Sequence, residues 1–259
     1  MDQAKYYPCD ACHTPIEPGH KFCGRCGATT PPAVLAMDVN YWSDLQDPTK
    51  ASLVVIRGEA LEGLTYHLRA NEHLLGGQGA PIALDDPFVS PQHANLFYRG
   101  KELFLHDEDS TNGVYLRIRE KTKLAPGDTF IAGDQVFRLE PMPQVADHTD
   151  AQGTYFYGSP THNSPFRVVQ LLEKGGIGFA HCPRGSRVTI GRAGADINLI
   201  GDLFLSPSHC AIEQTTDGFF LSDLGSQNGT YVRLKRDHHL SHGDYFSVGR
   251  KVLRVEMNG

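Results

Sequence analysis

The 259-residue sequence lacks several features that would assign it to a common class of proteins. It has no excess of basic residues: 24 Lys and Arg face 30 Asp and Glu, for a net charge of −6. This balance argues against broad nucleic-acid binding. No apolar run approaches the ~18 residues that span a bilayer, and the first residues contain no apolar signal region. We therefore expect a cytoplasmic globular protein that does not enter a membrane.

Sequence patterns of enzymes are missing too, because the chain has no P-loop, no nucleophile elbow and no metal-binding pattern with an open position. Helical periodicity over twelve residues is also absent. Short runs rich in β-branched and aromatic residues occupy 166–172, 187–190, 219–222 and 251–256, with turn signals such as Asp217-Gly218 between them. The strand pattern predicts an all-β fold made of two-sheet sandwiches. The missing enzyme motifs predict a protein that is not an enzyme.

Four of the six cysteines lie in the first 26 residues, as two C-x2-C pairs ten residues apart: Cys9, Cys12, Cys23 and Cys26. In a reducing compartment such a cluster indicates a metal rather than disulfides. Four thiolates are the ligand set of a closed tetrahedral zinc site. Residues 1–30 resemble a zinc ribbon, and we predict that bound zinc supplies their folding free energy.

Two other readings of the cysteines explain less. Cys9, Cys12 and His13 match the c-type haem attachment pattern, which would leave the second pair without a role. A thioredoxin-like redox pair would need a surrounding βαβ pattern, which the sequence does not have.

An internal repeat fills most of the remaining chain. Residues 90–140 and 206–256 align without a gap and are identical at 19 of 51 positions, where average composition would give about three to four. The chain therefore carries two copies of one domain. We predict the following parts: a ribbon at 1–30, a linker at 31–50, the first repeat at 51–141, a linker at 142–164 and the second repeat at 165–259.

Polar residues at turn-rich breaks mark the second repeat. They are Gly191-Arg192, then Ser206-x-x-His209, then Asn228-Gly229. This set resembles the forkhead-associated (FHA) domain, whose pattern has the same three parts in the same order. The resemblance implies a β-sandwich that binds phosphothreonine peptides at the loops on one end.

The same resemblance assigns a role to each residue of the pattern. Arg192 and Ser206 would contact the phosphate, Gln227 would add a further phosphate contact, and Asn228 would hold the peptide backbone. The remaining residues would support the binding loops: His209, Gly191 and Gly229. A guanidinium suits this task because it offers a fixed fork of donors to two phosphate oxygens.

The first repeat departs from the pattern, because Gly77 stands where the arginine should be. The rest of a possible weak site remains: Ser90, His93, Thr111 and Asn112. Asp85 and Asp86 lie on the adjoining loop and would repel phosphate. We predict that this repeat serves as a packing or phospho-independent docking domain.

The linker at 142–164 contains three candidates for phosphorylation: Thr149, Thr154 and Thr161. The sequence thus predicts an adaptor in Ser/Thr kinase signalling that binds a threonine-phosphorylated protein in trans, or its own linker in cis. Two alternatives remain open. One is a phospho-independent interaction scaffold, and the other is a nucleic-acid-associated protein that acts through the zinc ribbon.

Overall fold

The structure is a computed structural model, and it describes these residues: 7–16, 22–23, 25–30, 50–58, 61–144, 149–160 and 162–257. The chain divides into two compact units, 1–50 together with Gly259, and 51–258. Almost all of the predicted linker at 31–50 lies outside the described residues. Each unit is considered separately below.

The N-terminal unit contains one small antiparallel pair of strands. β1 (Tyr7–Pro8) pairs with β2 (Pro15–Ile16), and an isolated bridge joins Phe22 to Thr29. Cys9, Ile16 and Cys23 are the buried residues of a small apolar cluster among this unit's described residues, and Cys12 and Ala28 pack against it. So small a cluster cannot stabilise a fold by burial alone, which leaves the cysteines to do so.

The second unit is built of strands, apart from one 3-10 turn, η1 (Glu173–Gly175), among its described residues. Strands of the first repeat are β3 (Ala51–Arg57), β4 (Thr65–His67), β5 (Glu72–Gly76), β6 (Ile82–Ala83), β7 (Ala94–Arg99), β8 (Glu102–Asp107), β9 (Val114–Arg117), β10 (Thr122–Leu124), β11 (Thr129–Ala132) and β12 (Gln135–Glu140). Strands of the second repeat are β13 (Arg167–Leu171), β14 (Ile177–His181), β15 (Arg187–Gly191), β16 (Ile197–Asn198), β17 (Cys210–Thr215), β18 (Gly218–Asp223), β19 (Thr230–Arg233), β20 (His238–Leu240), β21 (Tyr245–Val248) and β22 (Lys251–Met257). The predicted all-β fold class is confirmed. No helical turn among the described residues has the length and apolarity needed to cross a bilayer.

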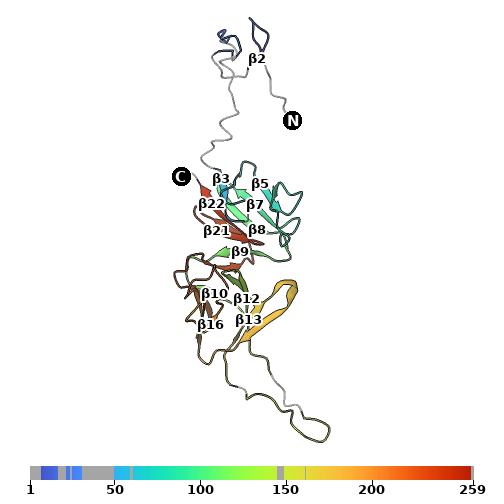
Figure 1. Cartoon of the computed structure of the whole chain (residues 1–259), viewed down its shortest axis with the longest axis vertical. Coiled ribbons are helices and arrows are strands. Elements are labelled where there is room, and N and C mark those ends of the chain that lie inside the picture. Colours follow the sequence, from blue (N-terminus) through green and yellow to red (C-terminus); the bar gives the residue numbers. More distant parts are fainter. Residues whose placement is uncertain are drawn as a thin grey trace. The chain divides into compact units, whose positions relative to one another are not determined.

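Three sheets make up this unit (Figure 1). The largest has ten strands in the order β14-β13-β12-β11-β19-β9-β21-β22-β3-β4. The two five-stranded sheets follow the orders β10-β18-β17-β15-β16 and β20-β8-β7-β5-β6. Every sheet therefore contains strands of both repeats.

The two repeats exchange their last three strands. β10 of the first repeat pairs with β18 of the second, and β12 pairs with β13. In return, β20 of the second repeat pairs with β8, and β22 pairs with β3. We call β3–β9 with β20–β22 the first sandwich, and β13–β19 with β10–β12 the second sandwich.

The hydrophobic cores follow this exchange. The core of the first sandwich buries Leu53 and Leu75 together with Phe246 and Leu253 from the far end of the chain. In the same way, the core of the second sandwich buries Phe130 of the first repeat with residues from 166 to 221. The ranges 51–141 and 165–259 remain a prediction of where each repeat begins and ends in the sequence. Each packed sandwich, by contrast, contains strands from both ranges.

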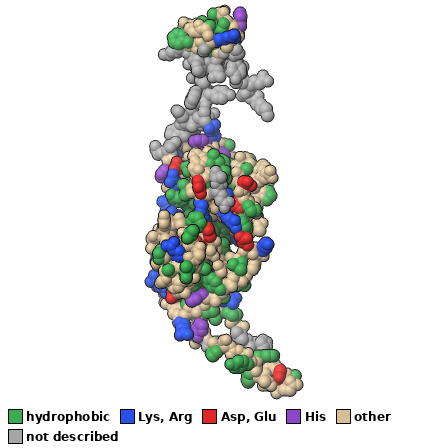
Figure 2. Space-filling view, in the orientation of Figure 1, with side chains coloured by type: hydrophobic (Ala, Val, Ile, Leu, Met, Phe, Trp, Pro, Cys, Tyr) green, Lys and Arg blue, Asp and Glu red, His purple; other side chains and the backbone are tan. Residues whose placement is uncertain are grey.

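A pseudo-two-fold axis relates the two sandwiches. β9 and β19 are equivalent strands of the two repeats, and they pair antiparallel with Leu116 opposite Val232. These positions are 116 residues apart, which is the offset of the repeat, so each is the counterpart of the other. The contact is therefore isologous, like that of a two-fold dimer built into one chain. On the face shown in Figure 2, Lys and Arg side chains are interspersed with Asp and Glu and do not gather into one basic stripe.

Candidate functional sites

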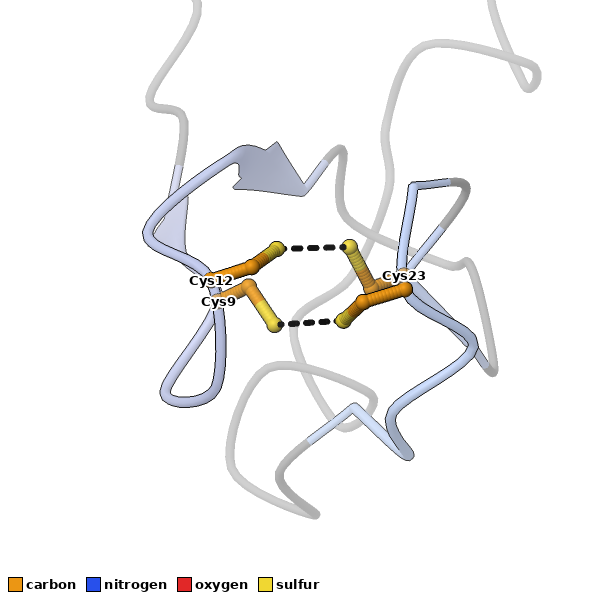
Figure 3. A group of neighbouring side chains, drawn as sticks. Cys9, Cys12 and Cys23 are labelled. Carbon is orange, nitrogen blue, oxygen red and sulfur yellow. Dashed lines mark hydrogen bonds between the residues drawn. The ribbon is translucent and has the colours of Figure 1, made fainter.

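The four N-terminal cysteines converge on one point. The Sγ atoms of Cys9 and Cys26 are 3.6 Å apart, those of Cys12 and Cys23 are 3.7 Å apart, and all four lie within 4.8 Å of one another (Figure 3). Sulfur ligands at the usual Zn–S distance of about 2.3 Å in a tetrahedron are about 3.8 Å apart. The donor set and its spacing therefore fit a zinc ion.

Each cysteine pair begins a tight turn with the same backbone geometry. The Cys9 carbonyl accepts the N–H of His13 at 2.8 Å, and the Cys23 carbonyl accepts the N–H of Gly27 at 2.9 Å. His13 and Gly27 both have left-handed backbone, with φ of 57° and 73°. These matched turns aim both cysteine pairs at the same centre.

Thr14 favours the thiolate form of its neighbour. Hydrogen bonding to the Thr14 side chain and backbone lowers the pKa of the Cys12 thiol to about 6. Zinc binds thiolates, so Thr14 favours metal binding at this one cysteine.

Two connections of the second repeat form the candidate peptide site: residues 192–209 between β15 and β17, which include the short strand β16, and the loop 224–229 between β18 and β19. His209 is fully buried and joins them. Its Nδ1 accepts the N–H of Ser206 at 3.1 Å, so its Nε2 carries the proton and donates to the Gly229 carbonyl at 3.0 Å. Burial lowers the pKa of His209, which keeps the ring neutral.

Three more contacts hold the loops together. The Ser206 hydroxyl accepts the N–H of Gln227 at 3.1 Å, and the Asn228 side-chain amide donates to the Phe204 carbonyl at 2.8 Å. A Cβ on Gly191 would lie 1.9 Å from the Pro207 carbonyl oxygen, so only glycine fits there. The structure thus brings Ser206, Gln227 and Asn228 to one place.

Asp223 stabilises the second loop through hydrogen bonds, a role that the sequence motif does not indicate. Its carboxylate accepts the N–H and hydroxyl of Ser226 at 2.9 and 2.6 Å, and the Thr230 hydroxyl at 2.7 Å. Burial raises its pKa, but these hydrogen bonds outweigh burial and the pKa of Asp223 lies below its usual value. Its identity with Asp107 at the same place of the repeat was the available signal.

Arg192 lies next to Ser206 through its backbone. Its backbone N–H donates to the Ser206 carbonyl at 2.9 Å, which fixes the residue beside the serine. The residue is half-buried, and its guanidinium makes no hydrogen bond or ion pair with any described residue. The side chain is therefore available to an external anion.

The first repeat builds the same framework without the arginine. His93 accepts the N–H of Ser90 at 2.9 Å and contacts the Gly113 carbonyl at 3.1 Å, and the Ser90 hydroxyl accepts the N–H of Thr111 at 3.2 Å. The Asn112 amide donates to the Phe88 carbonyl at 2.8 Å. These bonds therefore shape the loops in both repeats.

Gly77 occupies the place of Arg192, because its N–H donates to the Ser90 carbonyl at 2.9 Å as the N–H of Arg192 does to Ser206. Asp86 is buried and accepts the N–H of Phe88 at 2.9 Å and that of Arg250 at 2.7 Å, so its carboxylate holds the loop. Repulsion of phosphate by Asp85 and Asp86 stays a prediction. Asp85 is exposed.

Two arginines of the first sandwich, on β3 and β9, lie beside the second site. The Arg57 guanidinium lies 4.8 Å from the centre of the Phe204 ring and pairs with Asp134 at 3.1 Å. Arg117 packs against Gly229, since a Cβ there would lie 2.2 Å from its Nε. The sequence did not indicate that either residue lies beside the second site, because nothing in the motif tells how the two sandwiches meet.

Comparison with known proteins agrees with the sequence resemblance. Two segments, residues 74–133 and 188–249, match the family model of the FHA domain. Together they contain every residue of both candidate peptide sites. The matches cover neither the cysteine-rich unit nor the linker between the repeats.

Among characterised proteins, the FHA domain-containing protein FhaB of Mycolicibacterium smegmatis is 34% identical over 93 residues. FhaB of Mycobacterium tuberculosis is 32% identical over 93 residues. In both cases the match covers 34% of this chain and 59% of the relative, so the chain spans less than two thirds of these relatives. A solved structure from work on phosphothreonine-dependent FHA domain interactions aligns with 81% of this chain and 98% of its own, at 14% identity and a TM-score of 0.33.

Proposed function

We propose that this chain, which carries two FHA domains, is a phosphothreonine-binding adaptor in Ser/Thr kinase signalling. FHA domains are interaction modules that bind phosphothreonine peptides on partner proteins. The second site is the one that binds phosphate, and its partner is a protein phosphorylated on threonine. The first site does not take part in this binding.

The uncommitted guanidinium of Arg192 is the observation that carries this proposal. A phosphothreonine brings −1.5 to −2 charges and three acceptor oxygens, and a guanidinium can meet two of these oxygens at once. The Ser206 hydroxyl accepts the N–H of Gln227 and keeps its own proton to donate to the third oxygen. Asn228 uses its amide donor within the protein but keeps its side-chain oxygen for a peptide N–H.

A phosphopeptide library tests the proposal on the full chain. Phosphothreonine peptides should bind the wild type and lose at least tenfold in affinity with Arg192→Ala, because hydrogen bonds to a charged group contribute about 1.5–3 kcal/mol. Arg192→Lys should recover only part of this affinity, since an ammonium has no planar fork.

Arg99→Ala is a suitable control, since Arg99 is an exposed arginine with an ion pair to Asp237. It should bind like the wild type. Equal binding by wild type and Arg192→Ala would refute the proposal.

A second candidate function belongs to the first site. Its loops are complete, yet Gly77 leaves it without the phosphate-binding arginine, which favours phospho-independent docking of a partner protein. A partner that binds Arg192→Ala and loses affinity with Asn112→Ala would support this role. A partner that binds Asn112→Ala as tightly as it binds the wild type would argue against this role.

Zinc held by Cys9, Cys12, Cys23 and Cys26 would be structural, because four thiolates leave no open position for chemistry. It would fix the two turns relative to each other and so present a small rigid surface. Retardation of DNA or RNA that weakens steeply with salt would favour the remaining alternative, nucleic-acid association through the ribbon.

A further inference from the structure

The loop between the repeats starts and ends on the second sandwich. It joins β12 to β13, which pair antiparallel with Glu140 opposite Arg167 (Figure 1). Leu139 and Phe166, at the two ends, belong to the same core as Leu205, which lies next to Ser206. This arrangement results from strand exchange, since β12 belongs to the first repeat in sequence. Both ends of the loop are thus tethered to the sandwich that carries Arg192.

This loop exposes an unusual run of aromatic residues. Tyr155, Phe156 and Tyr157 are 71%, 73% and 103% exposed. Large contiguous patches of exposed apolar side chains mark interaction sites, and three consecutive exposed aromatics are a candidate for one. The residue directly before them is Thr154, also exposed. A threonine followed by three uncovered aromatics is therefore available in the loop.

The second site has an apolar border that matches such a segment. Ile200 is 78% exposed and Leu203 is 80% exposed, on the loop that leads to Ser206. Phe204 follows them, partly exposed, and its carbonyl holds the Asn228 side chain. The site thus combines a free guanidinium with apolar residues alongside, which suits a phosphothreonine whose neighbouring residues are apolar.

We propose that phosphorylated Thr154 is a ligand of the second site in the same molecule, with Tyr155–Tyr157 packed on Ile200 and Leu203. This inference rests on the proposed phosphothreonine binding. A protein kinase supplies the modification: the γ-phosphoryl group of ATP moves to the Thr154 hydroxyl oxygen, and ADP and the hydroxyl proton leave. Thr149 is a poorer ligand, because Asp150, Ala151 and Gln152 follow it.

The unmodified loop is closed by a turn that phosphorylation would open. Asp150 accepts the N–H groups of Gln152 and Thr154 at 2.9 and 2.8 Å, and a bridge joins Thr149 to Tyr155. The backbone hydrogen bond from Thr154 lowers the pKa of Asp150, so its carboxylate is charged. A phosphate on Thr154 adds negative charge beside that carboxylate and repels it. Phosphorylation of Thr154 would thus open this turn and release residues 154–157 from it.

Chain length permits the contact. Twelve residue steps separate Thr154 from Phe166, which span up to about 40 Å when extended. A domain of this size has a radius of gyration of about 13 Å, so its surface points lie within about 35 Å of one another. Short tethers give effective concentrations on the order of millimolar. A phosphorylated loop would therefore compete strongly with any partner in trans.

The test uses the full chain, prepared with phosphothreonine only at position 154, and as a matched control only at position 149. The probe is a fluorescent phosphothreonine peptide of unrelated sequence whose binding to the unmodified chain is abolished by Arg192→Ala. We expect the chain phosphorylated at Thr154 to bind the probe at least tenfold more weakly than the unmodified chain. The chain phosphorylated at Thr149 should bind it nearly as well as the unmodified chain. Leu203→Ser in the chain phosphorylated at Thr154 should restore much of the probe affinity.

The outcomes separate the two proposals. If no phosphothreonine peptide of a library binds the unmodified chain in an Arg192-dependent way, no such probe exists, and the proposed function is overturned together with this inference. Equal probe affinity of the unmodified chain and the chain phosphorylated at Thr154 would overturn the inference alone. Equal loss after phosphorylation at Thr149 would overturn the choice of Thr154. Sedimentation of the phosphorylated chain as a dimer would show binding between molecules and would overturn closure within one.

Discussion

Gly77→Arg should create a second phosphothreonine site in the first repeat. The surrounding loops already have the hydrogen bonds that shape the second site, including those of His93, Ser90 and Asn112. The position also accepts a side chain. Gly77 has no left-handed φ, and a Cβ there would lie 3.2 Å from the Val89 carbonyl oxygen, a contact that a shift of a few tenths of an ångström relieves.

The expected gain follows from the chemistry of the guanidinium. Hydrogen bonds to a charged group contribute about 1.5–3 kcal/mol, which corresponds to about a 10- to 150-fold change in affinity. Fluorescence anisotropy of a phosphothreonine peptide measures it best in an Arg192→Ala background, where the second site is silent. Gly77→Gln, which adds a side chain without charge, should show little gain.

Gly76→Ala provides the opposite control, because its Cβ would lie 2.0 Å from the Pro91 carbonyl oxygen and would displace the loop. It should abolish the binding that Gly77→Arg creates. If Gly77→Arg folds normally yet binds no better than Gly77→Gln, the arginine is not the residue that separates the two sites, and the reasoning fails.

Three further predictions concern the metal, pH and the strand exchange. Elemental analysis should find about one zinc per chain, and Cys12→Ser should lower it, whereas equal zinc in the variant would exclude the cysteine site. Burial lowers the pKa of His209. The buried neutral ring therefore contributes fully to stability above about pH 6.5, where the histidine of the unfolded chain is neutral as well, and this contribution is lost as the pH falls. Between pH 7.5 and 5.5 this histidine should lower the free energy of unfolding, measured by denaturation, by up to about 1.4 kcal/mol in total, and His209→Gln should remove that part of the change; an unchanged pH dependence in the variant would contradict this. Phe246→Ala should cost about 3–5 kcal/mol and should speed amide exchange first at Leu53 in the other repeat, while Phe130→Ala should spare Leu53. If the repeats exchange strands, amide hydrogen exchange at Leu53 must be slower in Phe130→Ala than in Phe246→Ala.

Short-range sequence patterns predicted those features that depend on contacts between residues close in sequence, namely the turns, the strands and the loops. The spacing of the cysteine pairs sets two similar turns around one centre, and the four sulfur atoms do converge. Alternating runs such as 187–190 became strands with inward-facing Val188 and Ile190. The position of Gly77 was also read correctly, because the loops of both repeats have the same hydrogen bonds.

The strand exchange could not be predicted, and its physical cause explains why. Leu124 and Leu240 are identical residues at equivalent positions, as are Phe130 and Phe246. Each core therefore accepts the last strands of either repeat with nearly the same packing, and the hydrophobic pattern does not choose between them. The choice depends on the connections after β9 and β19 and on the pairing of these two strands, which no local pattern encodes.

The tether of the 141–166 loop to the sandwich that carries Arg192 follows from that same choice. Arg57 and Arg117 lie beside the second site although neither is on an exchanged strand; the sandwiches are joined through the pairing of β9 with β19. Where a repeat protein shares strands between its repeats, a motif found in one repeat does not tell which chain segments surround it.

Titration calorimetry tests the central claim most directly, with a phosphothreonine peptide and its unphosphorylated twin added to the full chain. The account predicts one phosphopeptide per chain, no measurable heat with the twin, and loss of binding when Arg192 is replaced by alanine. Two equivalent sites, or phosphopeptide binding that persists without the Arg192 guanidinium, would contradict it.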